Sequence, residues 1–178
     1  MNISIIFVLS LVGLATLFYV VVVRRDKTRE RKAAWRHVVE AIEGTYQDTK
    51  IRGTHQGKSV EVFLNNGGYE IDIYSYFIRL KVPIQGFDWR VDFIAHSRTL
   101  EIRSDEEELK DKLAEAGLIT LIQSVSGHPQ VRYRADKGTI EYEMLVGDDS
   151  YVPSADEFQT QLNLLTQLAE LNSKLNVW

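Results

Sequence analysis

Cysteine is absent from the 178 residues of this chain, and proline occurs only three times. Without thiols the chain forms no disulfide, no thiolate metal site and no cysteine nucleophile. The sequence also lacks G-x-G-x-x-G, the spacing G-x-x-x-x-G-K-[ST] and the serine motif G-x-S-x-G. Gly53 and Gly57 instead suit a turn between two strands. These absences exclude the common signatures of thiol, nucleotide and serine hydrolase chemistry.

Metal-binding patterns are missing as well. The four histidines never occur as H-x-x-x-H, the spacing that places two zinc ligands on one helical face. The acidic run Asp105–Glu108 follows Ser104 and precedes an apolar-periodic segment, so its carboxylates suit the first turn of a helix. We therefore predict no metal, no cofactor and no enzymatic activity.

Charge is absent from the 21 residues Ile3–Val23. A helix of that length is about 30 Å long, which matches the hydrocarbon core of a bilayer. A cleaved signal peptide is the alternative, but no basic residue precedes the run and no small-x-small site follows it. The sequence predicts a transmembrane anchor at residues 1–23 in an inner or plasma membrane.

A basic segment follows at residues 24–32, the predicted juxtamembrane stalk. Because Lys and Arg beside a span tend to stay in the cytoplasm, we expect the N-terminus outside and the following domain in the cytoplasm. An external domain is the alternative. Basic side chains near the surface also attract anionic lipids. The predicted headgroup contacts are Arg24, Arg25, Lys27, Arg29, Arg31 and Lys32.

Residues 33–178 form the predicted cytoplasmic domain, which is acidic. It holds 15 Lys and Arg against 23 Asp and Glu, a net charge of −8. Nucleic-acid affinity depends on neutralising phosphates with basic groups. We therefore expect the bilayer and a protein as partners, and no nucleic acid.

The hydrophobic pattern of this domain predicts an α+β fold, a mostly antiparallel sheet with about three helices behind the membrane helix. Helical spacing appears after Ala33, after Ser104 and after Ser154, and Ser154 with Glu157 predicts a capping box at the start of the last helix. Strand patterns fill residues 45–103 and 130–146, and the apolar run Leu118–Val125 predicts a central strand.

Two hairpins have a register that the sequence indicates. With Asn66-Gly67 as the loop, Glu61 lies opposite Asp72, and like charges in opposite positions destabilise a sheet. Glu61, Glu70 and Asp72 are thus the candidate polar surface site. A neighbouring basic side chain, Lys58, Arg79 or Lys81, is expected to compensate it, and a divalent cation or a basic partner is the alternative. With Lys137-Gly138 as the second loop, Arg134 faces Glu141.

The last segment carries an apolar face from Leu164 to Trp178. Docking of this face on the sheet is the favoured interpretation, and the same face is expected to hold any dimer. Within the anchor, Ser10, Gly13 and Thr16 recur every three residues, a spacing that drifts around the helix and predicts no strong dimer through the span.

Elimination leaves a membrane-tethered, non-enzymatic module that binds a protein partner as the main functional hypothesis. The alternative is an enzyme or ligand-binding domain whose pocket is assembled from residues distant in sequence. Its polar contributors would be Glu61, Glu70, Asp72, Trp89 and His96.

Overall fold

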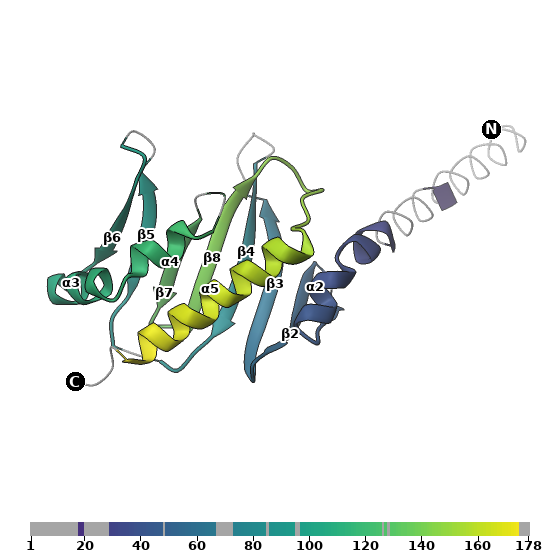
Figure 1. Cartoon of the computed structure of the whole chain (residues 1–178). Coiled ribbons are helices and arrows are strands. Elements are labelled where there is room, and N and C mark those ends of the chain that lie inside the picture. Colours follow the sequence, from purple (N-terminus) through teal and green to yellow (C-terminus); the bar gives the residue numbers. More distant parts are fainter. Residues whose placement is uncertain are drawn as a thin grey trace, which may run out of the picture. The chain divides into compact units, whose positions relative to one another are not determined.

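The computed structural model describes residues 18–19, 29–47, 49–66, 73–84, 86–94, 97–125, 127 and 129–174 (Figure 1). The chain divides into two compact units, Met1–Arg36 and His37–Trp178. In the first unit, residues 29–34 are helical. The second unit contains the sheet and the features described below.

The predicted transmembrane helix is wrong for the part of the chain that the structure describes. No helix there is long and apolar enough to cross a membrane. Helix α5, Ala155–Lys174, has 20 residues, but it carries charged residues in its first and last turns and its mean hydropathy is low. The apolar run itself lies outside the described residues except for Phe18 and Tyr19.

The basic segment is described only from residue 29 onward. Arg24, Arg25 and Lys27 lie outside the described residues. The lipid contacts of Arg29, Arg31 and Lys32, like the orientation of the chain, stay predictions.

The second unit is built on one eight-stranded sheet in the order β1-β2-β3-β4-β8-β7-β5-β6. Every pairing in it is antiparallel, which agrees with the alternation in the sequence. The strands are β1 (Thr45–Gln47), β2 (Lys50–His55), β3 (Lys58–Asn66), β4 (Tyr74–Lys81), β5 (Trp89–Ile94), β6 (Thr99–Ser104), β7 (Gln130–Arg134) and β8 (Thr139–Val146).

Helices cover one face of this sheet. Helix α5 runs across the strands, and α4 lies on the same side (Figure 1). The apolar face of α5 is buried, as the docking prediction expects, with Phe158, Leu162, Leu165 and Leu168 almost fully inaccessible. The other helices are α2 (Arg36–Ala41), α3 (Glu107–Glu115) and α4 (Leu118–Gln123).

The strand predicted at Leu118–Val125 is wrong, because this segment begins with helix α4. Gly117 has φ +79°, a left-handed conformation that ends α3 and lets a new helix begin at once. Leu118 and Ile122 are four residues apart, so they share one helical face, and both are buried. A short apolar run does not distinguish a buried helix from a buried strand.

Both predicted hairpin registers are wrong. Glu61 lies opposite Arg79 in β4, not opposite Asp72, so an unlike charge replaces a like charge. Arg134 lies opposite Thr139, which moves the β7–β8 register by two residues and brings Arg132 opposite Glu141. A shift of two preserves which face each side chain occupies.

A buried polar network joins α5 to the sheet. Tyr76 donates to Gln161 Oε1 at 3.0 Å, and Gln161 Nε2 donates to the Tyr142 hydroxyl at 3.3 Å. Tyr151 donates to Glu157 Oε1 at 2.8 Å. Glu157 also forms the predicted capping box with Ser154, since each backbone N–H donates to the other side chain. The start and the orientation of α5 are thereby fixed.

Candidate functional site

The strand alternation in β5 separates two faces of the sheet. Trp89 Nε1 donates to Asn172 Oδ1 of α5 at 2.8 Å, so Trp89 lies on the helix-covered face. Successive side chains of a strand point to opposite faces, so Arg90 lies on the other face. We call this other face the open face.

A row of seven charged residues crosses the open face, one from each of seven neighbouring strands. Each is the register partner of the next, from β2 to β6. In the order of the strands they are Arg52, Glu61, Arg79, Glu141, Arg132, Arg90 and Arg103. We call this set the charge row.

The first half of the charge row alternates in sign and is internally paired. Arg52 Nε lies 2.7 Å from Glu61 Oε1. Glu141 is fully buried between Arg79 Nε at 2.7 Å and Arg132 Nε at 2.6 Å. The guanidinium group of Arg79 also lies 4.7 Å from the ring centre of Phe63, a cation–π contact. This half is a structural element with its charges compensated.

The second half breaks the alternation. Arg132, Arg90 and Arg103 lie side by side in register on β7, β5 and β6. Like charges directly opposite one another destabilise a sheet, and here each arginine has a carboxylate within 4 Å: Glu141 beside Arg132, and Asp92 beside both Arg90 and Arg103. The arrangement gathers three guanidinium groups on adjacent strands, together with the carboxylates that pair with them.

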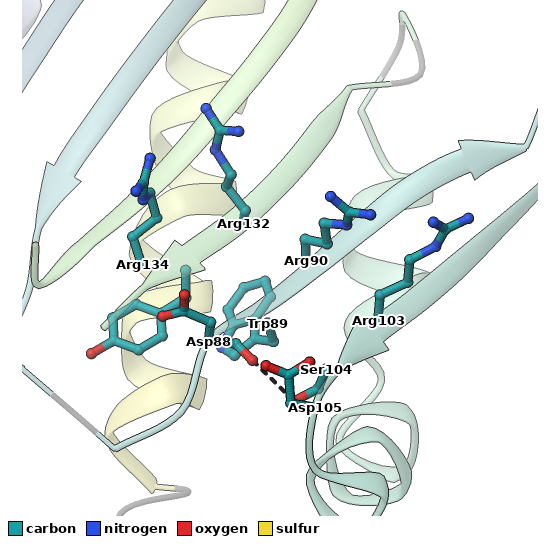
Figure 2. Close-up of a pocket in the computed structure, with 9 residues that line it drawn as sticks. Asp88, Trp89, Arg90, Arg103, Ser104, Asp105, Arg132 and Arg134 are labelled. Atoms are coloured by element: carbon teal, nitrogen blue, oxygen red, sulfur yellow. Dashed lines mark hydrogen bonds between the residues drawn. The ribbon is translucent and has the colours of Figure 1, made fainter. Parts of the chain in front are cut away.

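A hollow of about 490 Å³ lies at these strands. Four arginine side chains line it together with two aspartates (Figure 2). We call it the arginine hollow, and its lining residues are Asp88, Trp89, Arg90, Arg103, Ser104, Asp105, Arg132, Tyr133 and Arg134. In Figure 2 the four guanidinium groups extend in the same general direction from neighbouring strands.

Acidic neighbours orient these arginines without covering them. Asp92 lies 3.1 Å from Arg90 Nε and 3.3 Å from Arg103 Nε, and it accepts a hydrogen bond from Gln130 Nε2 at 2.5 Å. The side chains of Arg90 and Arg103 remain 49% and 46% exposed. Ion pairs at this exposure are weak, because water and salt screen them, so a ligand carboxylate can compete for these guanidinium groups. A planar guanidinium group held in this way is suited to bind an oxyanion in bidentate geometry.

The remaining polar groups of the arginine hollow support its shape. Asp88 Oδ1 accepts a hydrogen bond from Ala135 N at 2.6 Å, which fixes the β7–β8 turn. Ser104 Oγ donates to the Asp88 carbonyl at 2.9 Å (Figure 2). The Ser104 hydroxyl therefore points its proton at a backbone carbonyl and not at a base. The lining contains no histidine, and within the described residues no three His, Asp or Glu side chains gather as a metal site.

Of the candidate polar site predicted from the sequence, only Glu61 belongs to the described residues, and Glu70 and Asp72 lie outside them. Glu61 pairs with Arg52 at 2.7 Å and lies 3.9 Å from Lys50, so basic neighbours compensate its charge. Of the alternative pocket residues, Trp89 is buried against α5 and also lines the arginine hollow, and His96 lies outside the described residues.

Sequence reasoning missed the arginine hollow because its strands are not neighbours in sequence. Arg132 and Arg134 alternate with Tyr133, which indicates that both face one side of β7. Nothing local shows that β7 pairs with β5, about 40 residues earlier. Only that pairing places Arg132 beside Arg90. Comparisons with protein-family models, curated proteins and solved structures find no match to this chain.

Proposed function

We propose that the unit His37–Trp178 is a non-enzymatic protein-interaction module that recognises an acidic segment of its partner in the arginine hollow. The observation that carries this proposal is the run Arg132, Arg90 and Arg103, three arginines in register on adjacent strands. Each of the three already has an acidic neighbour, and a carboxylate ligand would bind the guanidinium donors that these neighbours leave exposed.

The charge geometry favours carboxylates presented on an extended segment. Arg90 and Arg103 come from strands about 5 Å apart, and so do Arg132 and Arg90. Neighbouring acidic side chains on one segment span such a distance, and each guanidinium group offers several donors to a carboxylate. Hydrogen bonds between charged groups contribute about 1.5 to 3 kcal/mol each.

A protein segment suits this site better than a nucleic acid does. Residues 33–178 carry a net charge of −8, which repels an extended phosphate backbone. The arginine hollow is one local site, large enough for a few side chains. A short acidic segment therefore places a few carboxylates beside the arginines without bringing a long polyanion close to the acidic remainder of the domain.

A non-enzymatic role is supported by the orientation of the polar groups. The Ser104 hydroxyl is bonded to a carbonyl, and the Asp88 carboxylate is bonded to a backbone N–H. Neither forms the nucleophile–base pair that covalent or acid–base catalysis requires. An enzymatic site at Glu61 has less support, because Arg52 already pairs with that carboxylate.

The test compares Arg90→Gln with Arg52→Gln in the full chain. Both arginines belong to the charge row, both pair with one carboxylate, and their exposures are similar at 49% and 51%. The probe is a fluorescent peptide of alternating Glu and Ser, with a Gln and Ser peptide of equal length as the uncharged control. We expect Arg90→Gln to weaken binding of the acidic peptide about tenfold, which corresponds to about 1.4 kcal/mol. Arg52→Gln is expected to change it less than about twofold.

Equal weakening by the two variants would show that general electrostatics and not the arginine hollow determine binding. Equal affinity for the acidic and the uncharged peptide would overturn the proposal. Raising the salt concentration is expected to weaken binding of the acidic peptide, since partly exposed charges are screened.

A further inference from the structure

Strand β6 is the last strand of the sheet, and its outer edge is unpaired within the described residues. It spans six residues, Thr99–Ser104, whereas β1 at the opposite edge spans only three. Its backbone pairs with β5, and among the described residues no other segment makes a backbone hydrogen bond to it. An edge strand of this length is a template for another strand.

We propose that β6 pairs with β6 of a second copy of this chain, antiparallel and about a two-fold axis at Ile102. The two sheets would then continue into one another across the edge. This inference goes beyond the proposed function but shares Arg103 with it, since Arg103 lies on β6 and also lines the arginine hollow. Peptide binding reports on the arginine hollow and dimer formation reports on the edge, so failure of one is distinguishable from failure of the other.

The side chains of β6 are self-complementary in this register. Glu101 and Arg103 lie two residues apart on the open face, where they pair with each other at 3.0 Å within the chain, and their exposures are 54% and 46%. Pairing about Ile102 places Glu101 opposite Arg103 of the second copy, and Arg103 opposite Glu101 of the second copy. Opposite charges on facing strands stabilise their pairing. On the covered face, Ile102 meets Ile102 of the second copy.

Neighbouring registers lack this complementarity. A shift by two residues in one direction places Glu101 opposite its own copy, and a shift in the other direction places Arg103 opposite its own copy. Both bring like charges together, which is destabilising. A shift by one residue aligns the open face of one chain with the covered face of the other. Pairing about Ile102 is thus the register in which unlike charges face one another and the open faces of the two sheets lie on the same side.

The C-terminal dimer face predicted from the sequence is already occupied within the chain. Leu164 and Leu168 of α5 are buried in the domain. Leu175 and Trp178 lie outside the described residues. The apolar surface that would hold a second copy there instead docks α5 on the sheet.

Cysteine crosslinking tests the register directly, because the full chain contains no cysteine. Two full-length variants are made, Glu101→Cys and Arg103→Cys, and each is oxidised alone and in an equimolar mixture. In the mixture the thiol introduced at position 101 of one chain faces the thiol introduced at position 103 of the other, and the second salt bridge of the pair is retained. A disulfide requires Cα atoms within about 7 Å. Residues 101 and 103 of the two chains face one another and meet this condition, whereas the two residues 101, or the two residues 103, are two positions apart and do not.

We expect covalent dimers in the mixture, at least about tenfold more than in either variant alone, in agreement with this distance limit. No dimer in the mixture, or equal amounts in all three samples, would overturn the proposed register. The control is the variant Ser173→Cys, whose thiol is exposed in the last turn of α5. The amount of covalent dimer that it forms measures crosslinking by random collision.

Charge exchange provides a second test that does not depend on oxidation. Glu101→Arg and Arg103→Glu each bring like charges together in a homodimer, so each alone is expected to lower dimer affinity. Mixing the two chains restores unlike pairs at both positions, and so does the double variant. Circular dichroism confirms that each variant is folded. A double variant that dimerises no better than the single variants would contradict the proposal.

Discussion

Glu141 in β8 lies directly opposite Arg132 in β7, and its Oε2 atom accepts a hydrogen bond from Arg132 Nε at 2.6 Å. Its other oxygen, Oε1, lies 2.7 Å from Arg79 Nε. Glu141 is fully buried, whereas both arginines keep more than a quarter of their side chains accessible. One buried carboxylate therefore connects the compensated half of the charge row to the arginine hollow.

Glu141→Gln is predicted to destabilise the domain by about 3 kcal/mol. The substitution keeps the shape but leaves two arginines without their shared counter-charge, and breaking a buried pair costs about 3 to 5 kcal/mol. The lower end applies because both arginines remain partly solvated. Urea unfolding of the variant measures the loss. Glu101→Gln is the matched control, since Glu101 is more than half exposed; a loss as large in the control would contradict the role of burial.

Asn172→Ala is predicted to cost about 1 to 3 kcal/mol, because it leaves the buried Trp89 N–H without its acceptor. Asn163→Ala in the same helix removes an exposed hydrogen bond to Gln159 and is expected to cost less than about 0.5 kcal/mol. Denaturant midpoints of the two variants give the comparison. Trp89 fluorescence is also expected to change only in the first variant.

Gly53→Ala is predicted to be more destabilising than an ordinary surface substitution, by about 2 kcal/mol or more. A Cβ atom at Gly53 would overlap the Ile42 carbonyl oxygen and lie 2.7 Å from Gly44 Cα, and both are backbone groups. Gly147→Ala is the control, because a Cβ atom there meets nothing within 4 Å. Thermal unfolding of both variants tests this, and equal melting temperatures would contradict it.

Much of the fold follows from local patterns in the sequence. The β5–β6 hairpin agrees with the alternation around Val91 and Phe93. The capping box at Ser154 and Glu157 is confirmed, because both of its hydrogen bonds are formed. These features depend on residues close in sequence, so the pattern contains the information that determines them.

Features that depend on distant pairing were not predictable in the same way. In the register of β3 with β4, Val62 lies opposite Ile78 on the covered face. The connection between these strands is longer than the tight turn that the sequence predicted, because β3 ends at Asn66 and β4 begins at Tyr74. The arginine hollow requires β7 to pair with β5, and no local pattern indicates that pairing. Three adjacent arginines are visible only once the strand order is known.

Alkaline pH is predicted to destabilise the domain through its buried tyrosines. Burial raises the pKa of the Tyr76 hydroxyl well above its usual range, and nearby Tyr151 and Tyr142 add to that effect. Burial likewise raises the pKa of Tyr142. Tyrosine in the unfolded chain titrates near pH 10, so above that pH the unfolded state releases protons that the folded state retains. The contribution of these tyrosines to the free energy of unfolding is therefore fully present below about pH 10 and decreases as the pH rises further.

Urea unfolding at a series of pH values from about 8 to about 11 measures this dependence. The free energy of unfolding is expected to decrease in the upper part of the range, and Tyr76→Phe is expected to reduce the slope because phenylalanine has no proton to lose. Tyr76→Phe also removes the hydrogen bond to Gln161, so it lowers stability at neutral pH while flattening the alkaline decline. A variant that loses stability at neutral pH but keeps the full alkaline slope would show that Tyr76 is not among the groups responsible.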